Sequence, residues 1–149
     1  MELRPIVHEY VLQCGVESAF EVFAGRTGEW WHPDFTPDAS TFRDLVIEPK
    51  VGGRVLQVHD GPAEFDIGTV TVWDPPGRLV YTSTLAQPAG HTSEISVTFT
   101  PAGDGCRFHF EHGGWNATNA ADRDKFAQWS LILDRFAALA DANEARPTG

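Results

Sequence analysis

Residues 118–141 read TNAADRDKFAQWSLILDRFAALAD, and this stretch of the 149-residue chain contains no proline or glycine. Its apolar side chains recur at spacings of three and four residues: Phe126, Trp129, Leu133, Phe136 and Ala140. That period places them along one side of a helix, roughly 35 Å long at 1.5 Å per residue. The charged residues 122–125 near its start are expected to be solvated. A helix with so wide an aromatic stripe needs a concave partner, and a curved antiparallel sheet supplies one.

Upstream of this helix the sequence predicts mainly strands, which are separated by turns such as DPPG at 74–77. Seven segments have the composition and alternation of strands, and they are residues 6–14, 42–48, 54–59, 65–73, 79–85, 93–100 and 106–112. Between the first two, Ser18 followed by Glu21 predicts a capping box at the start of a short helix. Gly25 and Gly28 end that helical region.

The predicted order is therefore one strand, short helices, six strands and a long C-terminal helix. This is an α+β arrangement in which the helix lies on one face of an antiparallel sheet. The length suits a single domain over residues 1–149. We expect its core at residues 6–141 and a frayed tail at 143–149.

The composition argues against several classes of partner. Acidic residues number 21 and basic residues 11, which gives a net charge of −10 with neutral histidines. A chain this acidic is repelled by phosphate backbones and anionic lipids, so neither nucleic acid nor a membrane surface is expected as a partner. The first residues, MELRP, show no secretory signal, and no apolar run approaches the ~18 residues of a membrane span. We therefore expect a cytoplasmic protein.

Five short stretches carry a resemblance to a known family. They are VESAFEVF at 16–23, the tryptophan pair at 30–31, VGG at 51–53, GTVTVWDPPGRLV at 68–80 and GCRFHFEHGGW at 105–115. With the aromatic C-terminal helix, their order and spacing over residues 6–140 resemble the START-like helix-grip superfamily (SRPBCC). Within that superfamily, the chain looks most like the bacterial single-domain group of activator of heat-shock protein 90 ATPase homologs.

The resemblance implies an architecture and a range of functions. In the helix-grip fold a seven-stranded curved antiparallel sheet wraps around the long C-terminal helix. Two short helices lie between the first and second strands, and a cavity lies between the sheet and the long helix. Related domains bind apolar small molecules, and some are cyclases or hydrolases. We therefore expect a domain that binds an apolar or aromatic small molecule; the alternatives are a cyclase or hydrolase, and a chaperone-related interaction module.

Aromatic residues are the best indication of where a ligand binds. The chain has ten phenylalanines, five tryptophans and two tyrosines, although any one of them is more often core than cavity wall. The inward positions of the last strands and the facing helix stripe bring many of them together. The residues predicted to contact a ligand are Trp30, Trp31, Phe35, Tyr81, Phe99, Phe110, His112, Trp115, Trp129 and Phe136.

No catalytic residue, metal site or cofactor is predicted, and a protein without enzymatic activity is favoured. On a strand, His109 and Glu111 share one face and His112 lies on the other, so this segment offers at most two metal ligands. A catalytic zinc site needs three protein ligands. The sequence also lacks a nucleophile elbow and phosphate-binding glycine patterns. Polar groups inside the cavity would orient a ligand or serve an enzyme in acid–base work, and the candidates are His59, Glu64, Asp66, Tyr81 and His112.

The predicted outer face of the sixth strand bears on the interaction-module alternative. That face is polar, since it carries Glu94, Ser96, Thr98 and Thr100. It does not provide the apolar patch of several hundred Å² that a protein partner favours. An edge strand or a loop remains able to pair two copies, so a homodimer is a candidate assembly.

The two cysteines give a geometric prediction. In the helix-grip layout the first strand runs antiparallel to the seventh, which places Cys14 near Cys106, with Cα atoms within roughly 8 Å. A reducing compartment keeps both as free thiols. A redox switch is the alternative, and it requires an exposed thiol with a lowered pKa.

Overall fold

The computed structural model describes residues 3–32, 40–61, 64–84, 87–88 and 90–144. Its elements, in chain order, are β1 (Ile6–Leu12), α1 (Val16–Gly25), α2 (Thr27–Trp30), β2 (Phe42–Ile47), β3 (Arg54–His59), β4 (Glu64–Asp74), β5 (Arg78–Ser83), β6 (Ser93–Ala102), β7 (Gly105–Gly113), the 3₁₀ helix η2 (Ala120–Phe126) and α3 (Trp129–Glu144). The seven strands and their order confirm the prediction from sequence.

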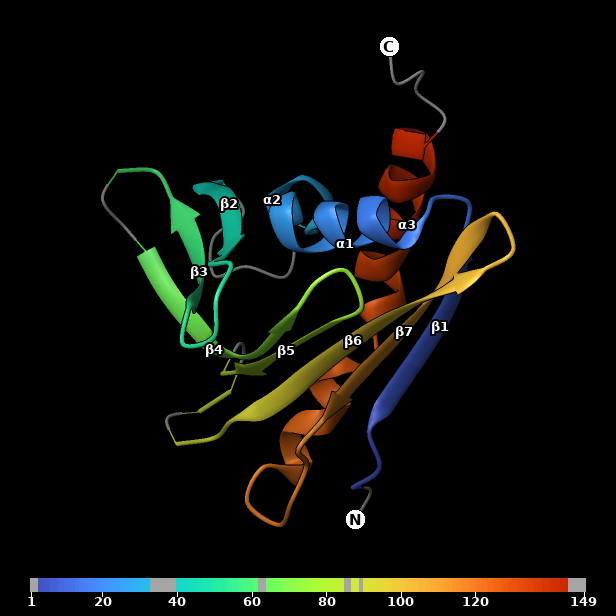
Figure 1. The fold of residues 1–149 in the computed structure, drawn as a ribbon. Helices are drawn as coiled ribbons and strands as arrows, with labels where there is room; N and C mark the ends of the chain where they lie inside the picture. The colour runs from blue at the N-terminus through green and yellow to red at the C-terminus, as the bar shows by residue number, and fades with distance from the viewer. Residues whose placement is uncertain (1–2, 33–39, 62–63, 85–86, 89, 145–149) are drawn as a thin grey trace.

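The strands form one antiparallel sheet in the order β1-β7-β6-β5-β4-β3-β2. The sheet curves around α3, and α1 and α2 lie between the β2 side of the sheet and α3 (Figure 1). This is the helix-grip α+β fold that was expected, with its short helices between β1 and β2. Side chains alternate between the two faces of each strand, so every second residue of β5 and β7, and of β6 from Ser93 to Phe99, is buried.

The first and last strands of the sequence are neighbours, as predicted. Leu12 of β1 lies opposite Cys106 of β7 in the antiparallel register, and Cys14 follows two residues later. Both cysteines are free thiols, and both are buried. Burial and the neighbouring Cys14 thiol raise the pKa of the Cys106 thiol to about 11. A raised pKa disfavours the reactive thiolate, which is the opposite of what a redox switch requires.

The start of α1 differs from the prediction. The helix begins at Val16 with Gly15 as its N-cap residue, and no side chain caps it through a hydrogen bond. The predicted capping box at Ser18 is therefore wrong, because Ser18 lies within the first turn. Packing sets this start: Ala19, Phe20 and Phe23 lie on the buried side of the helix, and tertiary burial outweighs a local capping signal.

The C-terminal helical region is divided, where the sequence predicts one continuous helix. A 3₁₀ helix at Ala120–Phe126 precedes α3, whose 16 residues span about 24 Å. The expectation that residues 122–125 are solvated is wrong for Asp122, which is 5% exposed. Asp122 and the preceding Asn119 bind the loop between β5 and β6 through their side chains. Such side-chain bonds compete with regular helical geometry, and the chain enters α3 only at Trp129.

No helix among residues 3–32, 40–61, 64–84, 87–88 and 90–144 is long and apolar enough to cross a lipid bilayer.

Candidate functional site

The concave face of the sheet contains a large aromatic cluster beneath β6 and β7. The ring centroids of Phe108 and Phe136 lie 4.9 Å apart, and those of Phe110 and Trp129 lie 4.7 Å apart. Trp30 reaches the same cluster from α2, 5.4 Å from Phe136. These spacings are those of rings in direct contact. Six predicted ligand residues pack in or beside this cluster with at most 5% of their surface exposed: Trp30, Trp31, Phe99, Phe110, Trp129 and Phe136.

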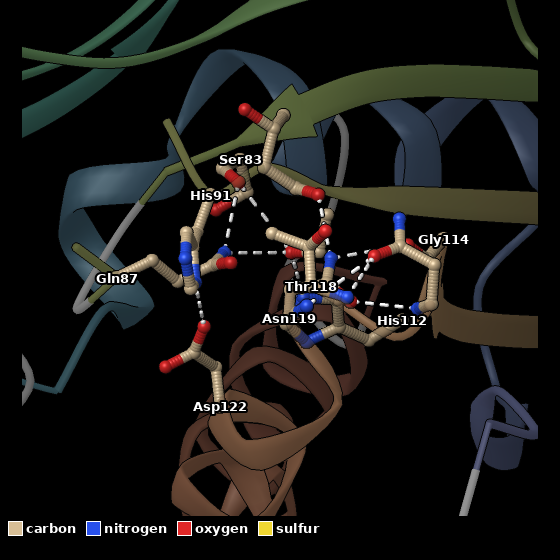
Figure 2. A network of polar contacts seen from close by, with 11 residues as sticks. Ser83, Gln87, His91, His112, Gly114, Thr118, Asn119 and Asp122 are labelled. Carbon is tan, nitrogen blue, oxygen red and sulfur yellow. Dashed lines mark hydrogen bonds and ion pairs between the residues drawn. The ribbon is translucent and has the colours of Figure 1, made fainter. Parts of the chain in front are cut away.

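A polar network adjoins this cluster where β5, β6 and β7 end (Figure 2). His112 of β7 is fully buried and lies at its centre. Its Nε2 atom is 2.6 Å from the Ser93 hydroxyl oxygen, and the Trp129 indole N–H donates to its Nδ1 atom at 2.9 Å. The side-chain amide of Gln87 donates to Ser93 Oγ at 2.9 Å and to the Ser83 carbonyl at 3.0 Å.

The Trp129 hydrogen bond determines the tautomer of His112. An indole N–H is a donor only, so Nδ1 accepts and the single ring proton of the neutral imidazole lies on Nε2. Nε2–H therefore donates to Ser93 Oγ, and the Ser93 hydroxyl is directed toward the Ser83 carbonyl 3.4 Å away. A serine nucleophile needs the opposite arrangement, with the histidine accepting its proton. The Ser93–His112 pair is thus organised for structure and not for hydrolysis.

The environment of His112 keeps its ring neutral. Burial, together with the positive charge of Arg123, lowers the pKa of His112 to about 3. The rings of Phe126 and Trp115 enclose it at centroid distances of 4.5 Å and 4.6 Å. Trp115 also donates its indole N–H to the His112 carbonyl at 2.8 Å. Two predicted ligand residues, His112 and Trp115, therefore use their ring nitrogens within the protein.

The same network holds the loop between β5 and β6 against η2. His91 Nδ1 lies 2.7 Å from an Asp122 carboxylate oxygen, and the Asn119 amide donates to the Thr92 carbonyl at 2.8 Å and the Gly114 carbonyl at 3.1 Å. The loop, the end of β7 and the start of the helical region are thereby joined, as Figure 2 shows.

A second buried polar group lies on β3. The Thr41 hydroxyl is 2.8 Å from His59 Nδ1, and His59 Nε2 is 3.3 Å from the Gln57 amide oxygen. The rings of Phe42 and Phe65 pack edge-on against His59. Gln57 is 0% exposed, and its amide nitrogen has no hydrogen-bond partner among the residues that the structure describes. A buried donor without a partner costs about 1–3 kcal/mol, so this group is poised for an acceptor.

Tyr81 and Gln87 add two further polar atoms. Tyr81 lies at an inward position of β5 with 5% of its surface exposed, and burial raises its pKa, so the hydroxyl keeps its proton. Within the described parts of the chain this hydroxyl makes no hydrogen bond. The buried Gln87 amide oxygen likewise lacks a partner there. With the Gln57 amide nitrogen, the described chain thus contains two donors and one acceptor that are buried or nearly so and are not used within it.

The remaining sequence candidates lie elsewhere. Glu64 and Asp66 are exposed on β4, and both pair with the Arg54 guanidinium, at 3.5 Å and 2.5 Å, so neither is a cavity group. His109 and Glu111 share the outer face of β7, as predicted, and His109 Nε2 lies 2.9 Å from Glu111 Oε1. Among the described residues no group of three or more His, Cys, Asp or Glu side chains is placed to hold a metal ion. Phe35 lies outside the described residues.

Sequence reasoning missed Gln57 and Gln87. Gln57 stands between Val55 and His59 at the inward positions of a buried strand, and a polar residue there is the signal that indicates it. Gln87 lies in a loop between two strands, where no pattern distinguishes it.

Comparison with known proteins identifies the family. Residues 16–141 match the model of the family described as Activator of Hsp90 ATPase homolog 1-like protein. The chain therefore belongs to this family, which confirms the resemblance seen in the sequence. A comparison with curated proteins finds no significant match.

Solved structures agree with the fold. Protein NE0264 from Nitrosomonas europaea superposes with a TM-score of 0.70 at 14% identity, covering 96% of this chain and 97% of that one. The Aha1 dimer from Colwellia psychrerythraea gives a TM-score of 0.66 at 19% identity, covering 94% and 96%. The anthrahydroquino-γ-pyrone synthase Txn09 is 29% identical with a TM-score of 0.56, covering 92% and 97%.

Proposed function

We propose that this member of the activator of Hsp90 ATPase homolog 1-like family binds a flat aromatic small molecule that carries oxygen atoms. The ligand lies between the concave face of the sheet and α3, on the side of Gln57 and Tyr81. The observation that carries the proposal is the fully buried Gln57 amide nitrogen without a partner among the described residues. A ligand carbonyl that accepts from this nitrogen removes its cost of about 1–3 kcal/mol.

The surroundings of Gln57 suit an aromatic oxygenated ligand. Tyr81 lies in the hydrophobic core and contributes a protonated hydroxyl, and Gln87 contributes a buried acceptor. Pockets of this kind bind mainly through apolar walls, and a few polar groups set the orientation. The 29% identity to a synthase of a fused-ring γ-pyrone compound supports the same ligand class.

Titration with 1,8-dihydroxyanthraquinone tests the proposal. This flat probe carries carbonyl and hydroxyl oxygens, and its absorption quenches tryptophan emission when it binds near the core. We expect saturable 1:1 binding, weakened about five- to tenfold by Tyr81→Phe, which removes one hydroxyl and little volume. Ser96→Ala on the outer face of β6 is the matched control and should leave the affinity unchanged. Absence of saturable binding, or equal affinity in Tyr81→Phe, would contradict the proposal.

A cyclase is the second candidate function, and the identity to Txn09 favours it. A protonated Tyr81 hydroxyl inside the sheet can donate to a ligand oxygen that gains charge as a ring closes. The test substrate is 1-(2-hydroxyphenyl)butane-1,3-dione, which closes to 2-methylchromone with loss of one water. A rate above buffer that disappears in Tyr81→Phe would establish this activity, and a rate equal to buffer would exclude it for this substrate.

We also propose a cytoplasmic homodimer. The two buried free thiols fit a reducing compartment. β1 is an outer strand of the sheet, and its Val7 and Val11 are 46% and 65% exposed. An outer strand with exposed apolar side chains is suited to pairing with a second copy. Sedimentation should show a dimer that Val11→Lys dissociates, and a wild-type monomer at high concentration would contradict the assembly.

A further inference from the structure

A groove of about 600 Å³ lies between α1 and β2, apart from the residues proposed to bind the aromatic ligand. Among the described strands, β2 is the last of the sheet and pairs with β3 alone, and both α1 and α2 pack against it. Figure 1 shows the short helices beside this strand. One face of α1 and the consecutive β2 residues 44–47 form the walls, and the turn between β4 and β5 closes one end.

The interior of the groove is mainly apolar. Phe20 of α1, Leu45 and Ile47 of β2 and Trp73 of β4 line it. Trp73 packs edge-on against Phe20, with ring centroids 5.2 Å apart, and remains partly exposed. An accessible indole ring attracts a cation through its π face.

Among the lining residues that the structure describes, every charged one is acidic: Glu17, Glu21 and Asp44. Asp44 is held in place, because its Oδ1 atom accepts the Leu45 N–H at 2.8 Å and its carboxylate lies against Gly28. Within the described chain, Glu17 and Glu21 have no hydrogen bond or ion pair. Arg26, which follows α1, donates to the Glu29 carboxylate from Nε at 2.7 Å and from a terminal guanidinium nitrogen at 2.8 Å. The charge of Glu21 acts on Arg26 through space.

We propose that this groove is a second binding site, for a small organic cation that has an aromatic or aliphatic body. The carboxylates of Glu17, Glu21 and Asp44 attract an ammonium or amidinium head, while Phe20 and Trp73 contact the body. The volume lies in the range of small-molecule sites, about 300–1,000 Å³. Charge complementarity selects the cation, because an anion would meet three carboxylates and, among the described lining residues, no basic group.

The test uses three probes of nearly the same shape: 2-phenylethylammonium, 2-phenylethanol and phenylacetate. Each is titrated into ¹⁵N-labelled full-length protein at pH 7 and followed by amide and indole NMR signals. We expect the ammonium to shift the Trp73 indole signal and amides of α1 and β2. The alcohol should bind at least about fivefold more weakly and the carboxylate not measurably, as partly exposed ion pairs and cation–π contacts imply.

Charge-neutral variants show whether the groove carboxylates are responsible. Glu17→Gln combined with Glu21→Gln should weaken the ammonium by about tenfold, at roughly two- to fivefold for each carboxylate. Glutamine is a good helix former, so α1 is retained. The paired control is Glu94→Gln on the outer face of β6, which removes one charge from the chain but none from the groove. The affinity of that control should match the wild type.

Three results would overturn the inference. These are equal binding of the ammonium and the alcohol, shifts that map away from α1 and β2, and unchanged affinity in the double variant. The described residues that line the groove include neither Gln57, Tyr81 nor Gln87. Failure of the anthraquinone titration therefore leaves this test unaffected, and the reverse also holds.

Discussion

The neutral, buried state of His112 predicts a measurable loss of stability in acid. We expect its pKa to be near 6.5 in the unfolded chain, whereas it is about 3 in the folded protein. The unfolded state therefore binds more protons between these two values. The stability that the neutral His112 contributes to the folded protein is fully present above about pH 6.5 and is lost as the pH falls toward 3.

The size of this effect follows from the two pKa values. Relative to a protein that lacks this histidine, the wild type should lose about 2.5 kcal/mol between pH 7 and pH 4.5. The reference variant is His112→Gln, because the glutamine amide keeps one acceptor for the Trp129 N–H and one donor for Ser93. The free energy of unfolding of this variant at pH 7 should be about 1–3 kcal/mol below that of the wild type, since packing against Trp115 and Phe126 is lost.

Urea unfolding followed by tryptophan fluorescence measures both proteins at pH 7, 6, 5 and 4.5. The difference in unfolding free energy should shrink or reverse as the pH falls, because only the wild type contains the proton-binding imidazole. Carboxylates titrate in both proteins and cancel in the comparison. Parallel curves for the wild type and His112→Gln would refute the assignment of a buried neutral imidazole with a lowered pKa at His112.

Three further predictions concern the interior. Tyr81→Phe should leave the free energy of unfolding unchanged or raise it by up to about 1 kcal/mol, since its hydroxyl has no partner in the described chain; thermal unfolding checks this. Phe136→Ala should lower the free energy of unfolding in urea by about 3–5 kcal/mol, because the ring is 0% exposed and lies among four aromatic side chains. A loss below about 1 kcal/mol would contradict this packing. Cys14 and Cys106 should react with an aromatic disulfide reagent at pH 8 only as fast as local unfolding exposes them, because both thiols are buried and the pKa of Cys106 is about 11. Rapid reaction of the native protein would contradict this.

The local sequence pattern was sufficient to predict the strands and the turns that connect them. Alternation along β5, β6 and β7 reports which side chains face the interior, and turn residues mark where each strand ends. The aromatic stripe of α3 likewise predicts a helix that packs against a sheet, because its period places Trp129, Leu133 and Phe136 on one side. These features depend on residues a few positions apart, so one sequence is enough to show them.

The candidate site depends on residues that are distant in sequence. The tautomer of His112 is set by Trp129 on another element, and Asp122 is buried because His91 of a distant loop meets it. The unpartnered nitrogen of Gln57 is a property of its surroundings, and no local pattern encodes it. The groove beside α1 exists because β2 is the last strand of the sheet. Burial, proton position and empty space follow from long-range packing, so only the tertiary structure decided them.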